Sequence, residues 1–332
     1  MKTILMLILY LVFYINNYEI IMHEDINKIV SISLKGDNEL WLFSGKDAHH
    51  VVQYSLEQKR VIKKMIGKGK GPLEAELIDY GVLNEKDNSI FIKKTNGGLL
   101  KVSSDGQLIK YNGDVSITSI LQTNYLQFYE NEILLSCMSD LTISSLKNNS
   151  SIVVGYILDS NTLEIKSEVK IPTSLIDYDE SIKTLRNIFI SSYVFRISNK
   201  EFYIFIQGLN KYIIYNVFKN TYTEKKLNLK RFFKIKAKKN PQFDIWGSQY
   251  CAINNSCVIT DKKVYTFFGN KHQEIPFGYF EIDLTNKNIS QVILIDDDYE
   301  EITELKGYIK NNKIFLYNNY FQNSYIIYYK DL

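Results

Sequence analysis

Cysteine and proline are scarce in this sequence, whose 332 residues include three Cys and four Pro. Three Cys cannot form the dense bridging of a disulfide scaffold, and 16 Gly with four Pro exclude collagen-like and low-complexity chains. An excess of charge of one sign is also absent, since 40 Lys and Arg accompany 37 Asp and Glu. The formal net charge of +3 is too small for the basic field that drives nonspecific nucleic-acid binding, so we expect no nucleic-acid partner.

Long apolar runs are limited to one segment, Ile4–Ile15, which follows Lys2. It offers about a dozen residues where a membrane-spanning helix needs roughly 20. A basic residue before a short apolar run is typical of a secretory signal, although small residues at the usual cleavage spacing are missing. We expect residues 1–17 to be an export signal or membrane anchor, with a buried first strand as the alternative, and a periplasmic, membrane-anchored or extracellular protein. No Cys lies near residue 20, so an amino-terminal Cys for lipidation is not available.

A strand-like sequence pattern recurs along the remaining chain, and the whole sequence is 45% hydrophobic and 14% aromatic. Each copy of the pattern joins runs rich in Ile, Tyr and Phe through turns of Asn, Asp and Gly. A repeat of about 50 residues matches the four-stranded blade of a β-propeller rather than a helical repeat. The sequence therefore predicts an all-β fold, a six-bladed β-propeller with four-stranded antiparallel blades, in one domain over 18–332. The six units are 28–66, 81–111, 125–171, 192–227, 249–295 and 302–329.

The sixth unit contains three strands, so its blade needs one more. Tyr18–Met22 can supply it, and an outer strand from the amino-terminal side would close the ring and remove an open edge. Ser174–Arg186 is the one candidate helix, in the connection between the third and fourth units.

The segment Ile66–Glu74 reads I-G-K-G-K-G-P-L-E. It resembles the G-x-G-x-G-P-G-E-F segment of a family of exported bacterial six-bladed β-propellers related to TolB-like and NHL-like propellers. That family carries the segment between its first and second blades, where it falls here, while Leu73 and Ala75 depart from the family's Gly and aromatic residue. The resemblance implies a secreted or surface-associated propeller, often lipid-anchored, with no generally established enzymatic activity.

The glycines of this segment allow two interpretations. Gly67, Gly69 and Gly71 permit positive φ and can turn backbone N–H groups into one concavity, where Lys68 and Lys70 would flank an anionic ligand. The Gly-Lys-Ser/Thr ending and following helix of a P-loop are missing. We favour a tight crossover between blades over ligand binding, and expect Gly69→Val to lower thermal stability.

Candidate metal ligands are few. His49 and His50 would face opposite sides of a strand, and we interpret both as solvated turn residues. Asp296, Asp297 and Asp298 form the densest carboxylate cluster, in a loop where Ca²⁺ is a weak alternative to solvation. The EF-hand spacing is absent, so we expect no cofactor.

Six cations interleave with two Phe in another loop. This basic patch can contact an anionic membrane surface or an anionic glycan, although an exposed connection between blades explains it as well. Its members are Lys230, Arg231, Lys234, Lys236, Lys238 and Lys239.

Cys251 and Cys257 flank Asn254-Asn255, which we interpret as a tight hairpin. An oxidising compartment could bridge the two Cys if they face the same side, leaving Cys137 outside the bridge and buried. No nucleophile elbow, zinc-protease helix or dinucleotide fingerprint occurs in the sequence.

These features favour a noncatalytic binding or scaffold propeller of the cell envelope, recognising a peptide, a glycan or a partner protein. The alternative is a propeller hydrolase or lyase with a carboxylate or metal site at the channel mouth, and a third possibility is a purely structural interaction module. Two or more carboxylates or His converging at one mouth would favour the enzyme, whereas an aromatic, uncharged mouth would favour binding.

Overall fold

The fold is taken from a computed structural model of the chain. The residues that it describes are 18–22, 28–45, 48–71, 73–95, 97–114, 117, 120, 123–142, 151–176, 187–206, 211–226, 253–260, 262–270, 275–286, 288–295, 305–318 and 325–329.

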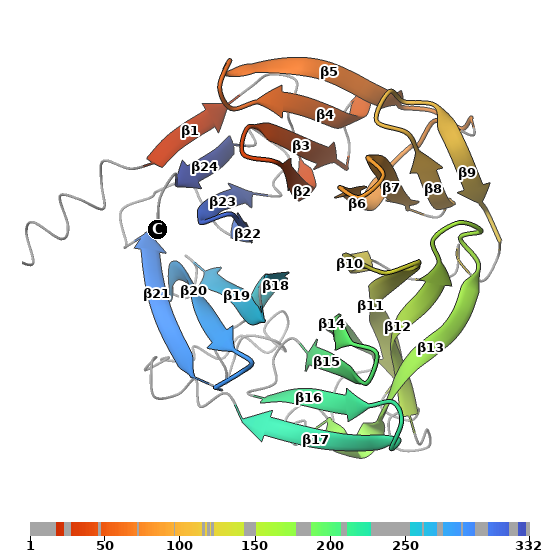
Figure 1. The fold of residues 1–332 in the computed structure, drawn as a ribbon, viewed down its shortest axis with the longest axis vertical. Coiled ribbons are helices and arrows are strands. Elements are labelled where there is room, and N and C mark those ends of the chain that lie inside the picture. Colours follow the sequence, from red (N-terminus) through yellow and green to blue (C-terminus); the bar gives the residue numbers. More distant parts are fainter. Residues whose placement is uncertain are drawn as a thin grey trace, which may run out of the picture.

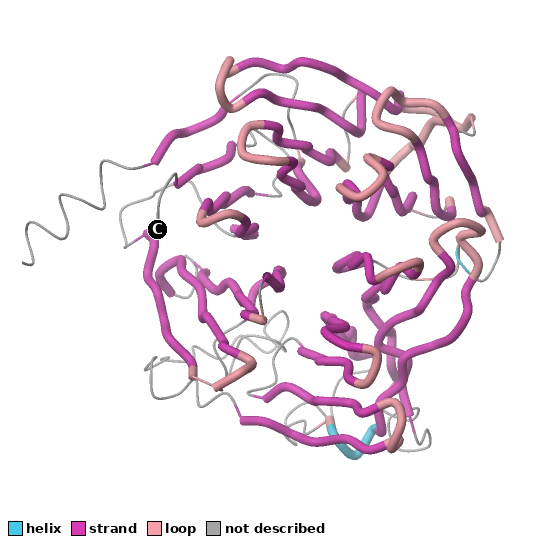
Figure 2. The backbone as a smooth tube through the Cα atoms, in the orientation of Figure 1, coloured by secondary structure: helices cyan, strands magenta, loops and turns pink. Residues whose placement is uncertain are grey.

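The chain is an all-β propeller with four-stranded antiparallel blades, set around a central channel (Figure 1). Strands β2, β6, β10, β14, β18 and β22 lie nearest the channel, and the chain then moves outward through each blade. Figure 2 shows that the described chain is almost entirely strand and turn. The first two blades are β2 (Ile29–Lys35), β3 (Glu39–Ser44), β4 (His49–Ser55) and β5 (Arg60–Gly67), then β6 (Ile78–Asn84), β7 (Ser89–Lys94), β8 (Gly98–Val102) and β9 (Leu108–Asn112).

The next eight strands form one eight-stranded sheet. It contains two antiparallel sets, and the far end of β11 pairs with the start of β14, Met138 opposite Ser191, to join them. The strands are β10 (Thr123–Tyr129), β11 (Glu132–Thr142), β12 (Ser151–Asp159), β13 (Ile165–Pro172), β14 (Asn187–Ser198), β15 (Glu201–Ile206), β16 (Lys211–Asn216) and β17 (Thr221–Lys226).

The remaining strands form two four-stranded sheets, one of which closes the ring. As predicted, Tyr18–Met22 is a strand, β1, and it pairs antiparallel with β24 from Tyr18 opposite Tyr329 to Met22 opposite Tyr325. The other strands are β18 (Ile253–Thr260), β19 (Lys263–Asn270), β20 (Ile275–Asp283), β21 (Ile289–Ile295), β22 (Leu305–Lys310), β23 (Lys313–Asn318) and β24 (Tyr325–Tyr329).

The predicted hairpin at Asn254-Asn255 is wrong. Strand β18 runs through both residues, and its register against β19 shifts between Ile253 and Cys257. Four positions on β18, from Ile253 to Cys257, span two on β19, and such an irregularity can be absorbed as a bulge without ending a strand, which explains why a turn-like Asn pair occurs inside one. Of the predicted helix at Ser174–Arg186, the described part shows a 3₁₀ turn at Thr173–Leu175, and residues 177–186 lie outside the described residues.

The core lies between neighbouring blades, so the middle strands are buried on both faces. All six residues of β7 are buried, and Phe43 of β3 is fully buried in the cluster shared by the first two blades. Cys137 is buried in the next interface, as predicted. Two-sided burial explains the near-continuous apolar strands of the sequence.

Side chains also connect the inner strands at the channel. Ser31 Oγ of β2 donates to the carbonyl of Gly81 at 2.7 Å and accepts from its N–H at 2.9 Å. Ser33 Oγ accepts from the N–H of Leu83 at 3.2 Å. Farther round the ring, Gln127 of β10 bonds both the N–H and the carbonyl of Arg196. These bonds satisfy edge groups that four-stranded blades otherwise leave unpaired at the channel.

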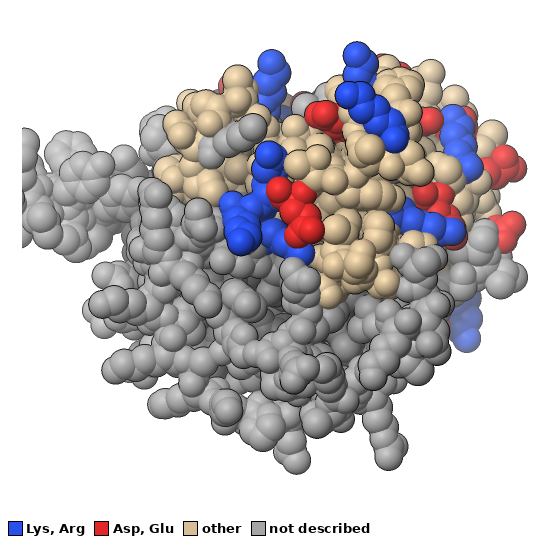
Figure 3. All heavy atoms as spheres, turned by 90° about the horizontal axis from the view of Figure 1, so that it is seen from below, with Lys and Arg blue, Asp and Glu red and all other residues tan. Residues whose placement is uncertain are grey.

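Charges of both signs are interspersed over the described surface seen in Figure 3. This agrees with the near-neutral formal charge. Among the described residues, no helix is both long and apolar enough to cross a membrane.

Candidate functional site

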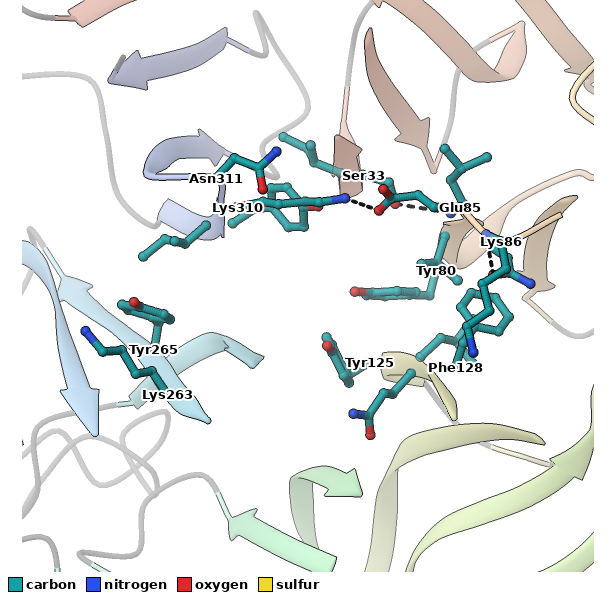
Figure 4. Close-up of a pocket in the computed structure, with 18 of the residues that line it drawn as sticks. Ser33, Tyr80, Glu85, Lys86, Tyr125, Phe128, Lys263, Tyr265, Lys310 and Asn311 are labelled. Carbon is teal, nitrogen blue, oxygen red and sulfur yellow. Dashed lines mark hydrogen bonds and ion pairs between the residues drawn. The ribbon is translucent and has the colours of Figure 1, made fainter. Parts of the chain in front are cut away.

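A cavity of 580 Å³ opens at the end of the channel where the inner strands finish and turn outward (Figure 4). Strands β6 and β22 contribute residues up to their ends, β2 and β10 contribute residues from their interiors, and β19 contributes its first and third residues. The size is within the range of small-molecule sites. The polar and aromatic side chains that line it are Ser33, Tyr80, Asn84, Glu85, Lys86, Tyr125, Gln127, Phe128, Lys263, Tyr265, Tyr308, Lys310, Asn311 and Asn312.

Four tyrosines lie in the wall, on strands β6, β10, β19 and β22. Tyr80 and Tyr125 each lie four residues before the end of an inner strand, and their rings meet edge to face at 6.2 Å between centroids. Tyr308 accepts a hydrogen bond at its hydroxyl from the N–H of Leu34, 3.1 Å away. Tyr265 packs edge to face on Tyr279 at 5.7 Å. These contacts hold the rings in place without a ligand.

The phenol groups of Tyr80 and Tyr308 stay neutral at physiological pH. Desolvation raises the pKa of Tyr80 well above its usual value, and the neighbouring Tyr317 and Tyr125 raise it further. Desolvation likewise raises the pKa of Tyr308, against the lowering effect of the Leu34 N–H bond. Neutral hydroxyls both donate and accept hydrogen bonds, so the wall offers apolar ring faces with polar tips.

Three lysines and one glutamate reach the same cavity. Lys310 donates to the carbonyl of Leu34 at 2.7 Å and forms an ion pair with Glu85, so it joins β22 to the β6–β7 turn. Lys263 pairs with Glu281 at 2.7 Å, outside the cavity lining. Lys86 is exposed on the β6–β7 turn. The described lining therefore carries a positive balance.

Carboxylates do not converge here among the described lining residues: Glu85 is the one acid, and no His lines the cavity. Nor do the described residues anywhere bring together three His, Cys, Asp or Glu side chains that could hold a metal. A pair of catalytic carboxylates or a metal site would need such convergence, which the described lining does not show.

The glycine segment lies where it was predicted, between β5 and β6, and away from the cavity lining. None of Gly67, Gly69 and Gly71 has positive φ; the left-handed residue is Ile66, at φ 59°. A Cβ on Gly69 would lie 2.1 Å from Glu74 Oε2, so a close approach explains this glycine.

The carboxylate of Glu74 fills the turn that the glycines make. Its Oε2 accepts from the N–H of Gly71 at 2.9 Å, while the N–H of Gly69 donates to the carbonyl of Ala75 at 3.0 Å. Lys68 is exposed, and Lys70 pairs with Glu76 at 3.6 Å. The loop therefore binds an anionic group of its own chain, and an outside anion would compete with it; ligand binding at these residues stays a prediction.

Replacing Gly69 with valine is expected to lower the melting temperature by about 2 °C, because the new side chain displaces Glu74 and breaks its bond to Gly71, worth about 1 kcal/mol. Differential scanning calorimetry measures this. Gly67→Val is the matched control, since nothing lies within 4 Å of a Cβ there. Unchanged melting of Gly69→Val would contradict the structural interpretation.

His50 is not a solvated turn residue, which corrects the sequence interpretation. It is fully buried as the second residue of β4, whereas His49 is exposed. Its Nδ1 lies 2.8 Å from the carbonyl oxygen of Ser44, and its Nε2 lies 2.7 Å from that of Ala75. The ring thus connects the end of β3 to Ala75, directly after the glycine segment. The polar character of His50 alone did not indicate this buried position.

Replacing His50 with leucine is expected to lower the free energy of unfolding by about 1–3 kcal/mol, because buried carbonyl oxygens lose their donor. Urea denaturation of the full chain measures the change. His49→Leu is the control, and we expect less than about 0.5 kcal/mol there because the residue is exposed. If His50→Leu lowers the free energy of unfolding no more than His49→Leu does, the hydrogen bonds of the buried ring do not stabilise the fold.

Several predicted sites lie outside the described residues. They are the amino-terminal segment 1–17, the basic patch Lys230–Lys239, the carboxylates Asp296–Asp298, and Cys251. Cys257 lies on β18. Because Cys251 lies outside the described residues, the disulfide between Cys251 and Cys257 stays a prediction.

The tyrosine cavity was not found from the sequence. A signal existed, because the inner strands of a propeller line its channel. Assigning β6, β10 and β22 as inner strands would have placed Tyr80, Tyr125 and Tyr308 along the same channel.

No protein-family model and no curated protein matches this sequence. Among solved structures, a member of the DUF4221 family from Bacteroides vulgatus is similar, with a TM-score of 0.57 and 11% identity over 95% of this chain and 98% of that one. A presumptive exported protein of Bacteroides fragilis has a TM-score of 0.50 and 12% identity, covering 94% of each chain. At these identities the likeness shows the propeller fold alone. The chain is thus structurally similar to a bacterial propeller over nearly its whole length.

Proposed function

We propose that this protein is a noncatalytic binding propeller whose ligand enters the cavity lined by Tyr80, Tyr125, Tyr265 and Tyr308. The observation that carries the proposal is the convergence of these aromatic side chains, with amides and lysines, at one end of the channel. Concave sites with apolar walls and a few polar groups are the common form of ligand sites. A peptide, a glycan or part of an envelope protein could occupy it.

The blade number and the location belong to the same proposal. Counting the eight-stranded sheet as two blades gives six four-stranded blades, each at the place of one sequence repeat. Export to the cell envelope is supported by the apolar run after Lys2 and by the name of the structurally similar Bacteroides fragilis protein. An anionic membrane surface stays a possible partner of the basic patch Lys230–Lys239.

A hydrolase or lyase is the less supported alternative. The described cavity holds one carboxylate, and Lys310 neutralises it. Acid–base catalysis by a pair of carboxylates would need a second carboxylate within reach of the ligand.

Retention of a ligand from envelope extract tests the proposal. The full chain is immobilised as wild type, as a mouth variant (Tyr265→Ala with Lys86→Gln) and as an outer-strand control (Tyr111→Ala with Lys110→Gln, on β9). We expect wild type and control to retain the same peptide, glycan or protein and the mouth variant to lose it. Equal retention by all three, or a chemically altered ligand after incubation, would contradict noncatalytic binding at the mouth.

A further inference from the structure

We infer that the ligand of this cavity is an acidic saccharide, a sugar that bears a carboxylate or sulfate group. The inference rests on the proposed function, since it identifies the chemistry that the same cavity selects. Three features of the lining support it: backbone edges that are already bonded, neutral aromatic and amide side chains, and a positive balance of charge.

The bonded edges disfavour an extended peptide. A peptide that binds as an added strand needs unpaired backbone N–H and carbonyl groups along the edge that it joins. Here Ser33 accepts from the N–H of Leu83, and Tyr308 accepts from the N–H of Leu34, both at the cavity wall. These two N–H groups are therefore not available to an added peptide strand, which favours recognition through side chains.

The side chains suit a ring with an apolar face and a rim of hydroxyl groups. Tyr265 and Phe128 present aromatic surface, against which the C–H face of a sugar can pack. The amide of Gln127 already bonds the backbone of Arg196, whereas Asn84 keeps its Nδ2 donor and Asn311 its Oδ1 acceptor at different points of the wall, where each can pair with a sugar hydroxyl group. Neutral phenol groups can do the same.

The charge of the lining selects an acidic sugar over a neutral one. Lys310 pairs with Glu85, and Lys263 pairs with Glu281 outside the lining, so the exposed Lys86 supplies the positive balance of the described lining. Lys86 is exposed on the rim, where its ammonium group can reach an anionic substituent. The same lysines disfavour a quaternary ammonium ligand, which aromatic cages otherwise bind.

Isothermal titration calorimetry of the full chain tests the inference with three acidic probes and one neutral probe. The acidic probes are trigalacturonate, triglucuronate and a sulfated chondroitin disaccharide, which separate carboxylate from sulfate, and the neutral probe is galactotriose. We expect at least one acidic probe to bind, at least tenfold more tightly than galactotriose, with affinity that falls as salt rises. Lys86→Gln should weaken that binding about fivefold, and Tyr265→Ala about tenfold.

Lys110→Gln is the matched control, because it removes the same charge from the outer strand β9 and should leave the affinity unchanged. Equal weakening by Lys110→Gln would show that binding reflects overall charge and would overturn the inference. If no acidic probe binds, or galactotriose binds equally, the acidic-saccharide assignment is wrong. The proposed function survives that result if the mouth variant still loses the ligand retained from envelope extract, and fails with it if that retention is also unaffected.

Discussion

Alanine at position 81 is expected to lower the free energy of unfolding by about 3 kcal/mol, near the upper end of overpacking effects. A Cβ on Gly81 would lie 2.0 Å from Cδ1 of Phe43, a fully buried ring of the neighbouring blade. Strand β6 cannot simply retreat, because Ser31 bonds both the N–H and the carbonyl of Gly81. Urea denaturation measures the loss.

Gly67→Ala is the control for this change, since a Cβ there meets nothing within 4 Å. A double-mutant cycle with Phe43→Leu adds a sharper test, because shortening the ring relieves the overlap. The double variant should be less destabilised than the sum of the single changes by more than about 1 kcal/mol. Additive effects would mean that the contact between Gly81 and Phe43 does not limit the packing of the two blades.

Removal of residues 1–22 is expected to destabilise the propeller strongly, whereas removal of residues 1–17 leaves the ring closed. The longer deletion takes away β1, so β24 loses its five antiparallel partners and exposes an edge that promotes aggregation. It also removes Ile21, which is buried with Phe315 and Tyr328, and the 3.4 Å ion pair from Glu19 to Lys59 of the first blade. Calorimetry and light scattering measure melting and aggregation.

If the chain without residues 1–22 does not fold, a single substitution in β1 tests the same closure of the ring. Ile21→Ala should lower the free energy of unfolding by about 2–4 kcal/mol, as expected for a buried isoleucine. Ile62→Ala on β5 is the control, because Ile62 is 50% exposed and should change stability by less than about 0.5 kcal/mol. Similar changes in the free energy of unfolding for the two variants would show that β1 does not stabilise the closure of the ring.

Local patterns in the sequence were sufficient to predict the strands and the closing segment. Alternating apolar runs between Asn, Asp and Gly turns place the first two units, 28–66 and 81–111, over β2 to β9 with ends that differ by up to three residues, and the three-strand sixth unit leads directly to Tyr18–Met22. Both features depend on neighbours in sequence or on a simple count of strands, so no tertiary information is needed.

Features that depend on neighbouring blades were missed. His50 looks like a surface residue until the glycine segment folds over it and brings the Ala75 carbonyl to its ring. The pair Asn254-Asn255 favours a turn by residue type, yet it lies inside β18, where Ile253 and Cys257 on either side pair with β19. The cavity joins tyrosines that are 228 positions apart in sequence, from Tyr80 to Tyr308, and only closure of the ring brings them together.

Hydroxyl-radical footprinting of the full chain, before and after incubation with envelope extract, tests most directly whether the cavity is the binding site. Oxidation of each tyrosine is read by mass spectrometry, with Tyr111 on the outer strand β9 as the internal reference. Binding at the mouth predicts protection of Tyr80, Tyr125 and Tyr265 while Tyr111 stays unchanged. Protection of Tyr111 with no change at the cavity tyrosines would contradict it.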